Sequence, residues 1–141
     1  MDYTKLKELN GFDHIYQKAG SMLELGKTDK VVDLGCGTGQ MAFYLYRKCN
    51  CYIAGIDYSE VAINFSKEYL SNLKSFRGYE DLEKKVRFLW VNNDNLPDYK
   101  NIRAVFLVDV LEHLDNEEIE LVLDKIKSWK KKDGIYLVIH T

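Results

Sequence analysis

Short apolar runs alternate with amphipathic segments along most of this chain. The runs are rich in Val, Ile and Leu, whereas the segments between them repeat their apolar residues at helical spacing. Strands alternating with helices pair through right-handed crossovers, so the pattern predicts an α/β fold with a parallel sheet and helices on both faces. We predict strands at about 30–34, 51–56, 86–91, 103–108 and 134–140, and helices at about 39–48, 59–74 and 116–131.

The first part of the chain has a different pattern. From about Tyr3 to Leu25, apolar residues recur mostly every third or fourth position, with a break near Gly11. This spacing predicts an amphipathic helical lid or flank. We therefore divide the chain into this flank, residues 1–29, and an α/β core, residues 30–141.

A glycine-rich loop follows the first predicted strand. Gly35, Gly37 and Gly39 alternate there, and the small Cys36 lies between them. Glycine lets a chain turn sharply and lets a ligand approach the backbone N–H groups at the start of the next helix. A dinucleotide fingerprint would place its third glycine at position 40, which is Gln40 here. The loop therefore predicts a nucleotide-type cofactor site that is not a dinucleotide site.

An acidic residue ends the second predicted strand. Asp57 is followed by Tyr58 and by Ser59, which is a good N-cap for a helix. A carboxylate at this position can accept hydrogen bonds from both hydroxyls of a ribose. The alternative for Asp57 is a solvated turn or cap residue. Tyr58 either packs against an adenine ring or serves as ordinary packing.

The remaining candidate residues also follow predicted strands, at the edge where open α/β sheets bind their ligands. They are Asp33 with Gly35 to Gly39 after the first strand, Asp57 after the second, Asp94 after the third, and Val108 to His113 after the fourth. We expect these residues to lie together at the carboxyl ends of the strands.

Composition narrows the partners. A chain of 141 residues with a net charge of −2 has the length of one domain and no extended basic field, so we expect no nucleic-acid partner. No apolar stretch has the length of a membrane span, and the N-terminus lacks a secretion-type hydrophobic core. We expect a cytoplasmic protein without a membrane partner. The lysines at 127 and 130–132 fit the end of a helix, where cations complement its dipole.

The three cysteines fit a reducing compartment. Cys49 and Cys51 are close enough in sequence for a metal pair, but the chain has no second Cys/His pair to complete a tetrahedral site. We expect small buried side chains, and no nucleophilic role for Cys36.

The sequence Asp33-Leu-Gly-Cys-Gly-Thr-Gly39 resembles the cofactor loop of the class I S-adenosylmethionine-dependent methyltransferases. The resemblance extends from about Lys30 to Thr141. It implies methyltransferase activity, S-adenosylmethionine as cofactor with S-adenosylhomocysteine as product, and a Rossmann-like open sheet with strand order 3-2-1-4-5. The family's sheet usually has seven strands, so we expect its C-terminal strands to be missing and this chain to be incomplete.

The resemblance also implies roles for the cofactor-site residues. Gly35, Gly37 and Gly39, with Cys36 between them, would face the methionine part of the cofactor, and Asp33 would position its amino group.

Further along, Asp57 would hold the ribose beside Tyr58. Asp94 would accept a hydrogen bond from the adenine amino group, and the backbone of Asn95 would donate to the ring. The alternative for Asp94 is a turn residue among asparagines.

The segment from Val108 to Leu114 resembles the end of the fourth strand in small-molecule O-methyltransferases. Val108 and Asp109 would border the cofactor. His113 is the best candidate for a general base, because an imidazole can accept a proton at neutral pH, and Glu112 lies beside it in sequence. The alternative for His113 is a structural histidine. We expect methyl transfer to an oxygen, or a nitrogen, of a small-molecule acceptor.

Two other functions remain open. Asp109, Glu112 and His113 also resemble the ligands that metal-assisted RNA 2′-O-methyltransferases use for Mg²⁺ or Mn²⁺. This chain has Asp109 where those enzymes carry Glu, and it lacks their further histidine. The second alternative is an S-adenosylmethionine-binding module without turnover of its own. The motifs of DNA base methylation are absent from the end of the fourth strand.

The last predicted strand, Gly134 to His140, is strongly apolar and reads as a strand buried on both faces. Without neighbouring strands its edge would be unpaired. We therefore expect a homodimer, or a partner segment, to cover it.

Overall fold

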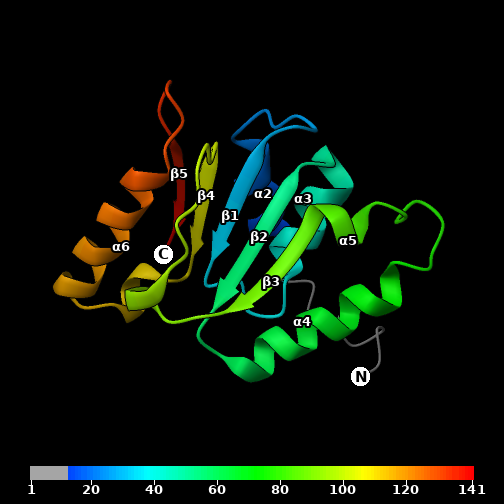
Figure 1. The fold of residues 1–141 in the computed structure, drawn as a ribbon, viewed down its shortest axis with the longest axis horizontal. Coiled ribbons are helices and arrows are strands. Elements are labelled where there is room, and N and C mark those ends of the chain that lie inside the picture. The colour runs from blue at the N-terminus through cyan, green and yellow to red at the C-terminus, as the bar shows by residue number, and fades with distance from the viewer. Residues whose placement is uncertain (1–12) are drawn as a thin grey trace.

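The computed structural model of the protein describes residues 13–141. Strands and helices alternate along it, as the apolar pattern predicts (Figure 1). The strands are β1 (Lys30–Leu34), β2 (Tyr52–Asp57), β3 (Val86–Trp90), β4 (Ala104–Val108) and β5 (Tyr136–His140). The α-helices are α2 (Asp13–Ser21), α3 (Gln40–Cys49), α4 (Glu60–Leu73), α5 (Leu82–Lys85) and α6 (Asn116–Trp129), and the 3₁₀ turns are η1 (Asn93–Asn95) and η2 (Leu111–His113).

The strands form one parallel sheet in the order β3-β2-β1-β4-β5. Val32 on β1 pairs with Ala54 on β2 and with Val105 on β4. The chain order therefore reverses at β1, which is where open α/β sheets bind their ligands. This confirms the predicted fold class and strand order.

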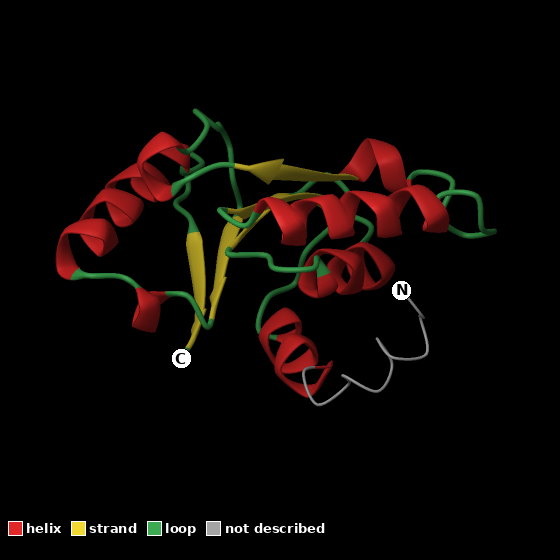
Figure 2. Cartoon of the chain, turned by 90° about the horizontal axis from the view of Figure 1, so that it is seen from below, coloured by secondary structure: helices red, strands yellow, loops and turns green. Residues whose placement is uncertain are grey.

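Two hydrophobic cores cover the two faces of the sheet. Alternate residues along each strand point to opposite faces, so Val31 belongs to one core and Val32 to the other. The first core contains apolar side chains of α3 and α4, and the second contains Val122, Ile126 and Trp129 of α6. Figure 2 shows α6 apart from the other long helices, on the other side of the strands.

The connection between β3 and β4 is short. Residues 91–103 contain only the 3₁₀ turn η1, as the sequence predicts for this stretch. The carbonyl of Pro97 accepts a hydrogen bond from Trp129 Nε1 at 2.8 Å, and Asp98 pairs with Lys125. These contacts hold the connection against α6, and the connection itself contributes no α-helix to this face of the sheet.

Two predictions at the chain's ends need correction. The helix predicted to reach Leu25 ends at Ser21, where Met22 N–H bonds to Ala19 O at 3.3 Å, and the predicted break near Gly11 lies outside the described residues. The prediction that β5 is buried on both faces is wrong, because within β5 only Val138 is buried. It is one of the two edge strands of the described sheet, and its exposed apolar side chains are Tyr136 at 48%, Leu137 at 39% and Ile139 at 48%.

Among residues 13–141, no helix combines the length and the apolar character that crossing a membrane requires.

Candidate functional site

A cavity of about 170 Å³ lies at the carboxyl ends of the strands, beside the reversal of strand order. It brings together several residues that the sequence predicts for the site, namely Gly35, Asp57, Tyr58, Asp109, Val110 and His113. It also contains residues that were not among these candidates, namely Leu34, Ile56, Val91, Asn93 and Leu114. Side chains that follow four different strands therefore meet at one place.

The glycine loop folds back onto the tip of β2. The N–H groups of Gly35 and Cys36 both donate to the carbonyl of Ile56, at 2.7 and 2.9 Å. Gly35 has φ of 78°, and a Cβ there would lie 2.4 Å from Val110 Cγ2. Gly37 has φ of 54°, yet a Cβ there would meet nothing within 4 Å. Gly35 is thus required by packing, whereas the space over Gly37 is open to a ligand.

Asp57 joins this loop to the next helix. Its Oδ2 accepts from Gly37 N–H and its Oδ1 from Ser59 N–H, both at 2.8 Å. Ser59 in turn caps α4 by accepting from Ala62 N–H at 3.2 Å. The structural alternative for Asp57 is therefore realised. The predicted ribose contact is compatible with it, because a carboxylate has about four lone-pair positions and two are used here.

Ser66 supports the same loop from α4, and the sequence analysis missed it. Its hydroxyl group lies 3.2 Å from the carbonyl of Gly37 and 3.0 Å from that of Ala62. The side chain is fully buried. A serine on the inner face of a helix that starts at the tip of β2 is the only sequence signal for this role.

Asp33 lies beneath the loop and does not line the cavity. It is 3% exposed, and burial, followed by the charge of Asp57, raises its pKa from 3.8 to about 7. Cys36 is also buried, and burial raises the pKa of its thiol far above the ordinary range. A thiol held protonated in this way fits the prediction that Cys36 is not a nucleophile.

A pair that the sequence analysis missed lies at the tips of β4 and β5. Asp109 has φ of 57°, its N–H donates to the carbonyl of His140 at 2.8 Å, and its Oδ1 lies 2.8 Å from His140 Nδ1. The expected strand order could have indicated this pair, because it places the fourth strand, which Asp109 follows, beside the fifth strand, which His140 ends. The structure thus holds Asp109 at the cavity by both backbone and side chain.

His113 lines the cavity and lies on the 3₁₀ turn η2. Its Nε2 is 4.0 Å from Glu112 Oε1, and its side chain is 74% exposed. Glu112 itself does not line the cavity. His113 is therefore accessible from the cavity and only loosely held.

The remaining predicted residues lie outside the cavity. Asp94 and Asn95 are exposed on η1, and the Asn95 N–H donates to the carbonyl of Asn92 at 3.0 Å. Asn93 lines the cavity instead. Val108 packs against the first core, and Gly39 caps α3 with φ of 85°. The backbone donor predicted at Asn95 is thus already used within η1.

The metal alternative requires Asp109, Glu112 and His113 to share one site. Within residues 13–141, no three His, Cys, Asp or Glu side chains group in the way that a metal ion needs. Asp109 pairs with His140, and His113 lies beside Glu112. The predicted three-residue ligand set is therefore not formed.

Residues 31–134 match the methyltransferase domain family. (S)-coclaurine N-methyltransferase of Thalictrum flavum subsp. glaucum is 31% identical over 111 residues, which are 78% of this chain and 28% of that protein. Probable cobalt-precorrin-6B C(15)-methyltransferase (decarboxylating) of Methanocaldococcus jannaschii is 32% identical over 107 residues, which are 72% of this chain and 54% of that protein.

Solved structures share the fold at lower identity. Geranyl diphosphate C-methyltransferase from Streptomyces coelicolor A3(2) has a TM-score of 0.74 at 19% identity, over 88% of this chain and 44% of that one. The [4+2]-cyclase SpnF has a TM-score of 0.73 at 23% identity, over 89% and 43%.

The chain spans 28% and 54% of the length of these two curated relatives. The family match covers most of the chain, including the glycine loop and the tips of β2 and β4. The chain therefore belongs to the methyltransferase domain family and has the Rossmann-like fold of the class I S-adenosylmethionine-dependent methyltransferases.

Proposed function

We propose that this chain binds S-adenosylmethionine along the glycine loop and serves methyl transfer to an oxygen or nitrogen of a small molecule. One observation carries the proposal. Asp57 clamps the loop through Gly37 at the edge of a cavity that also contains Asp109 and His113. A cofactor cradle and proton-accepting groups therefore meet at one end of the sheet in a methyltransferase-domain chain.

The residues present fit this cofactor. The space above Gly37 is open, and Asp57 on the cavity wall keeps lone pairs for ribose hydroxyls. Asp33 supplies a buried acid below the loop, to which a cationic amino group is complementary. The cavity of about 170 Å³ fits a part of the cofactor, and the open loop provides room for the rest.

When bound, S-adenosylmethionine supplies an electrophilic methyl group that a nucleophile displaces in line. The chain's own residues hold and orient the reactants. Asp57 and the loop fix one end of the site, while Asp109 and Val110 form the wall after β4. His113 faces the same cavity, where its imidazole can accept a proton from the attacking oxygen or nitrogen.

The names of similar proteins support a small acceptor. Besides the coclaurine enzyme, phosphoethanolamine N-methyltransferase of Plasmodium falciparum is 27% identical over 124 residues, which are 86% of this chain and 42% of that protein. Nitrogen therefore stands beside oxygen as the acceptor atom of the proposal.

The second candidate function is a cofactor-binding module without methyl transfer. The [4+2]-cyclase SpnF shares this fold although its name describes a different reaction, so the fold alone does not decide for methyl transfer. The two functions make the same prediction for cofactor binding and opposite predictions for methyl transfer.

A methyl-incorporation assay tests the proposal. The protein is incubated with S-adenosylmethionine carrying a labelled methyl group and a panel of small amines, phenols and hydroxy acids, and products are read by mass spectrometry. We expect label in a product with the wild type and with Glu60→Ala, a matched change at an exposed site on α4. Asp57→Ala should abolish it through weak cofactor binding. Tight cofactor binding with no transfer to any member of the panel would favour the binding module.

A further inference from the structure

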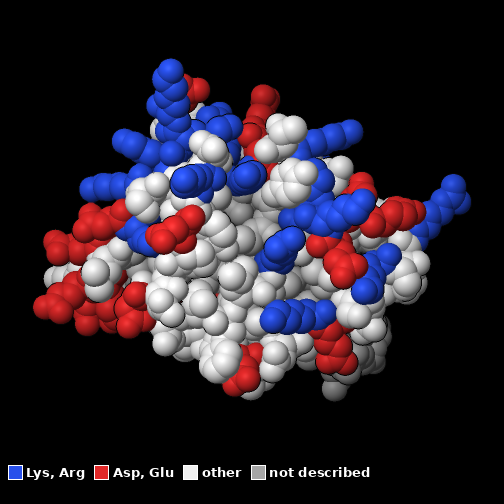
Figure 3. Space-filling view, in the orientation of Figure 1, with Lys and Arg blue, Asp and Glu red and all other residues white. Residues whose placement is uncertain are grey.

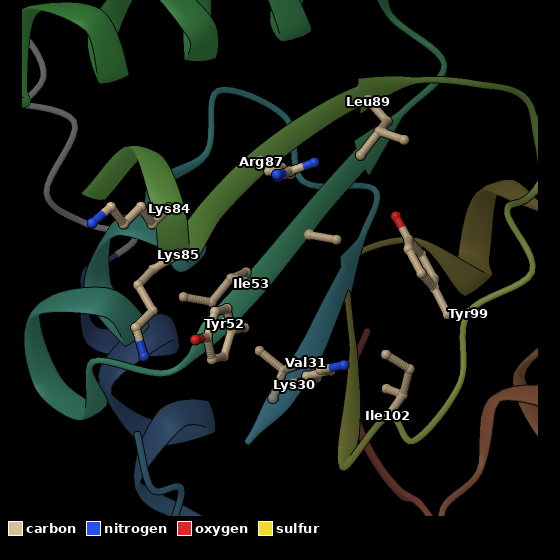
Figure 4. Close-up of a pocket in the computed structure, with 11 residues that line it drawn as sticks. Lys30, Val31, Tyr52, Ile53, Lys84, Lys85, Arg87, Leu89, Tyr99 and Ile102 are labelled. Carbon is tan, nitrogen blue, oxygen red and sulfur yellow. The ribbon is translucent and has the colours of Figure 1, made fainter. Parts of the chain in front are cut away.

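A second hollow lies near the amino ends of the strands, opposite to the cofactor cavity at their carboxyl ends (Figure 4). We call it the amino-end hollow. It measures about 320 Å³, within the range of about 300–1,000 Å³ found for small-ligand sites. Among the described residues, the β3–β4 connection contains only the 3₁₀ turn η1, so it contributes no α-helix to cover β2 and β3 on this face.

Cations line the amino-end hollow, and no carboxylate does. Lys30 starts β1, Lys85 ends α5 and Arg87 lies on β3. Lys84 also borders the hollow, but in Figure 4 its amino group points away from the other three. None of these cations forms an ion pair within residues 13–141. Like charges brought together without a counter-charge repel one another, so this arrangement favours an anionic ligand.

One cation is already held in place. Lys85 Nζ donates to the carbonyl of Lys27 at 2.8 Å and lies 3.9 Å from the centre of the Tyr52 ring. An ammonium fixed in this way loses little side-chain entropy when an anion binds it. Lys85 is therefore a preorganised anchor at one side of the hollow.

The rest of the lining is apolar and aromatic. Tyr99 stands opposite Lys85 in Figure 4, and its ring packs edge-on against Trp129 at 5.3 Å. Burial raises the pKa of Tyr99, and the positive charge of Arg87 opposes this rise. The Arg87 guanidinium therefore acts electrostatically on the Tyr99 hydroxyl group. The apolar lining residues are Val31, Ile53, Ala54, Leu89 and Ile102. Such a lining takes up an apolar or aromatic body next to the cations.

The distribution of charge on this face of the molecule also favours an anionic ligand at the amino-end hollow. Blue side chains gather over the amino ends of the strands in Figure 3, and red ones over α6 at the left. Lys30 and Gly35 flank opposite ends of β1, so the amino-end hollow is separate from the cofactor cavity.

We propose that the amino-end hollow is a binding site for an organic phosphate. Its phosphate group is attracted by the positive charges of Lys30, Lys85 and Arg87 around the hollow, and its apolar or aromatic body lies on the strands between Tyr52 and Tyr99. The site is independent of methyl transfer, so either proposal can fail alone.

Titration with 1-naphthyl phosphate, followed by its fluorescence, tests this site. We expect saturable binding that weakens as KCl is raised, because exposed charges are screened. Inorganic phosphate lacks the apolar body and 1-naphthol lacks the charge, so each should bind more weakly. Arg87→Glu and Lys30→Glu should each weaken the naphthyl phosphate by about tenfold or more, the scale of losing one charge-assisted contact. Lys127→Glu is the matched control on α6 and should leave the affinity unchanged.

Competition separates this site from the cofactor cavity. Saturating S-adenosylhomocysteine should leave the affinity for 1-naphthyl phosphate unchanged. The proposal would be overturned if S-adenosylhomocysteine displaced 1-naphthyl phosphate. It would also be overturned if Arg87→Glu and Lys127→Glu bound 1-naphthyl phosphate equally well, or if 1-naphthol bound as tightly as 1-naphthyl phosphate. Loss of binding upon dimerisation of the protein, seen by light scattering, would assign the hollow to a second copy and overturn it as well.

Discussion

Asp33 is almost fully buried beneath the glycine loop, and its pKa of about 7 stands well above the ordinary value of 3.8. Burial is the main cause, and the negative charge of Asp57 adds to it. A carboxyl group in this position is close to half ionised at neutral pH. It is therefore ready to become an anion when a cation arrives and costly to ionise when none is present.

The raised pKa makes stability depend on pH. The folded chain binds the Asp33 proton more tightly than the unfolded chain, so stability falls as pH rises from about 4 to about 7 and then levels off. The full difference corresponds to about 4 kcal/mol as an upper estimate. We expect Asp33→Asn, which cannot ionise, to gain stability relative to the wild type across this range. Urea unfolding of both proteins between pH 4 and 8 checks it, and a constant difference between them would contradict this explanation.

Asp109 combines a left-handed backbone with a side-chain bond to His140. Asn tolerates positive φ and can accept the same hydrogen bond, whereas a β-branched residue at positive φ is strained. We therefore expect Asp109→Asn to change the free energy of unfolding by less than about 1 kcal/mol, and Asp109→Val to lower it by about 2 kcal/mol or more. Urea unfolding measures both. Equal stability of the two variants would show that this backbone conformation is unimportant.

Substitution of His113 tests whether its imidazole acts as the general base of the proposed reaction. If its imidazole is the base, His113→Ala should lower turnover by about a hundredfold while changing cofactor affinity by less than about threefold. Steady-state kinetics on the acceptor found by the labelling assay, with calorimetry for the cofactor, separates these effects. Full activity of this variant would make alignment of the reactants the main source of catalysis.

Local sequence patterns predicted the helices, the strands and the strand tips, but they did not predict contacts between residues far apart in the sequence. The glycine loop and the tips of β1, β2 and β4 were predictable because spacing and strand ends are local features. The Asp109–His140 pair was missed because it joins residues 31 positions apart. The exposure of β5 was missed because an apolar run looks the same in a central strand and in an edge strand. Whether Asn93 or Asn95 lines the cavity depends on how the single 3₁₀ turn η1 is oriented.

The edge strand β5 should drive self-association. Within residues 13–141 no strand pairs with the outer edge of β5, and this edge with the exposed Leu137 and Ile139 can pair with a second copy. We expect light scattering at high micromolar concentration to show dimers. Ile139→Lys should shift the chain toward monomers, and Val61→Lys, at an 81% exposed position on α4, should not. A strict monomer would contradict the expectation for β5.

In the whole molecule, the two ends of the strands carry different chemistry. The carboxyl ends hold the glycine loop, Asp57 and the Asp109–His140 pair, whereas the amino ends hold the cations around the amino-end hollow. A parallel sheet makes this separation possible, because all strands point the same way. The acceptor side of the cofactor cavity and the phosphate site can therefore be altered independently.

The spacing of the glycine loop favours S-adenosylmethionine over a dinucleotide. Isothermal titration with S-adenosylhomocysteine and with NADH distinguishes the two ligands. We expect saturable binding of S-adenosylhomocysteine, none of NADH, and a loss of about 2–3 kcal/mol in Asp57→Ala, the scale of its charge-assisted bonds. Glu60→Ala should bind as the wild type does. Saturable binding of NADH without any binding of S-adenosylhomocysteine would show that the loop is not an S-adenosylmethionine site.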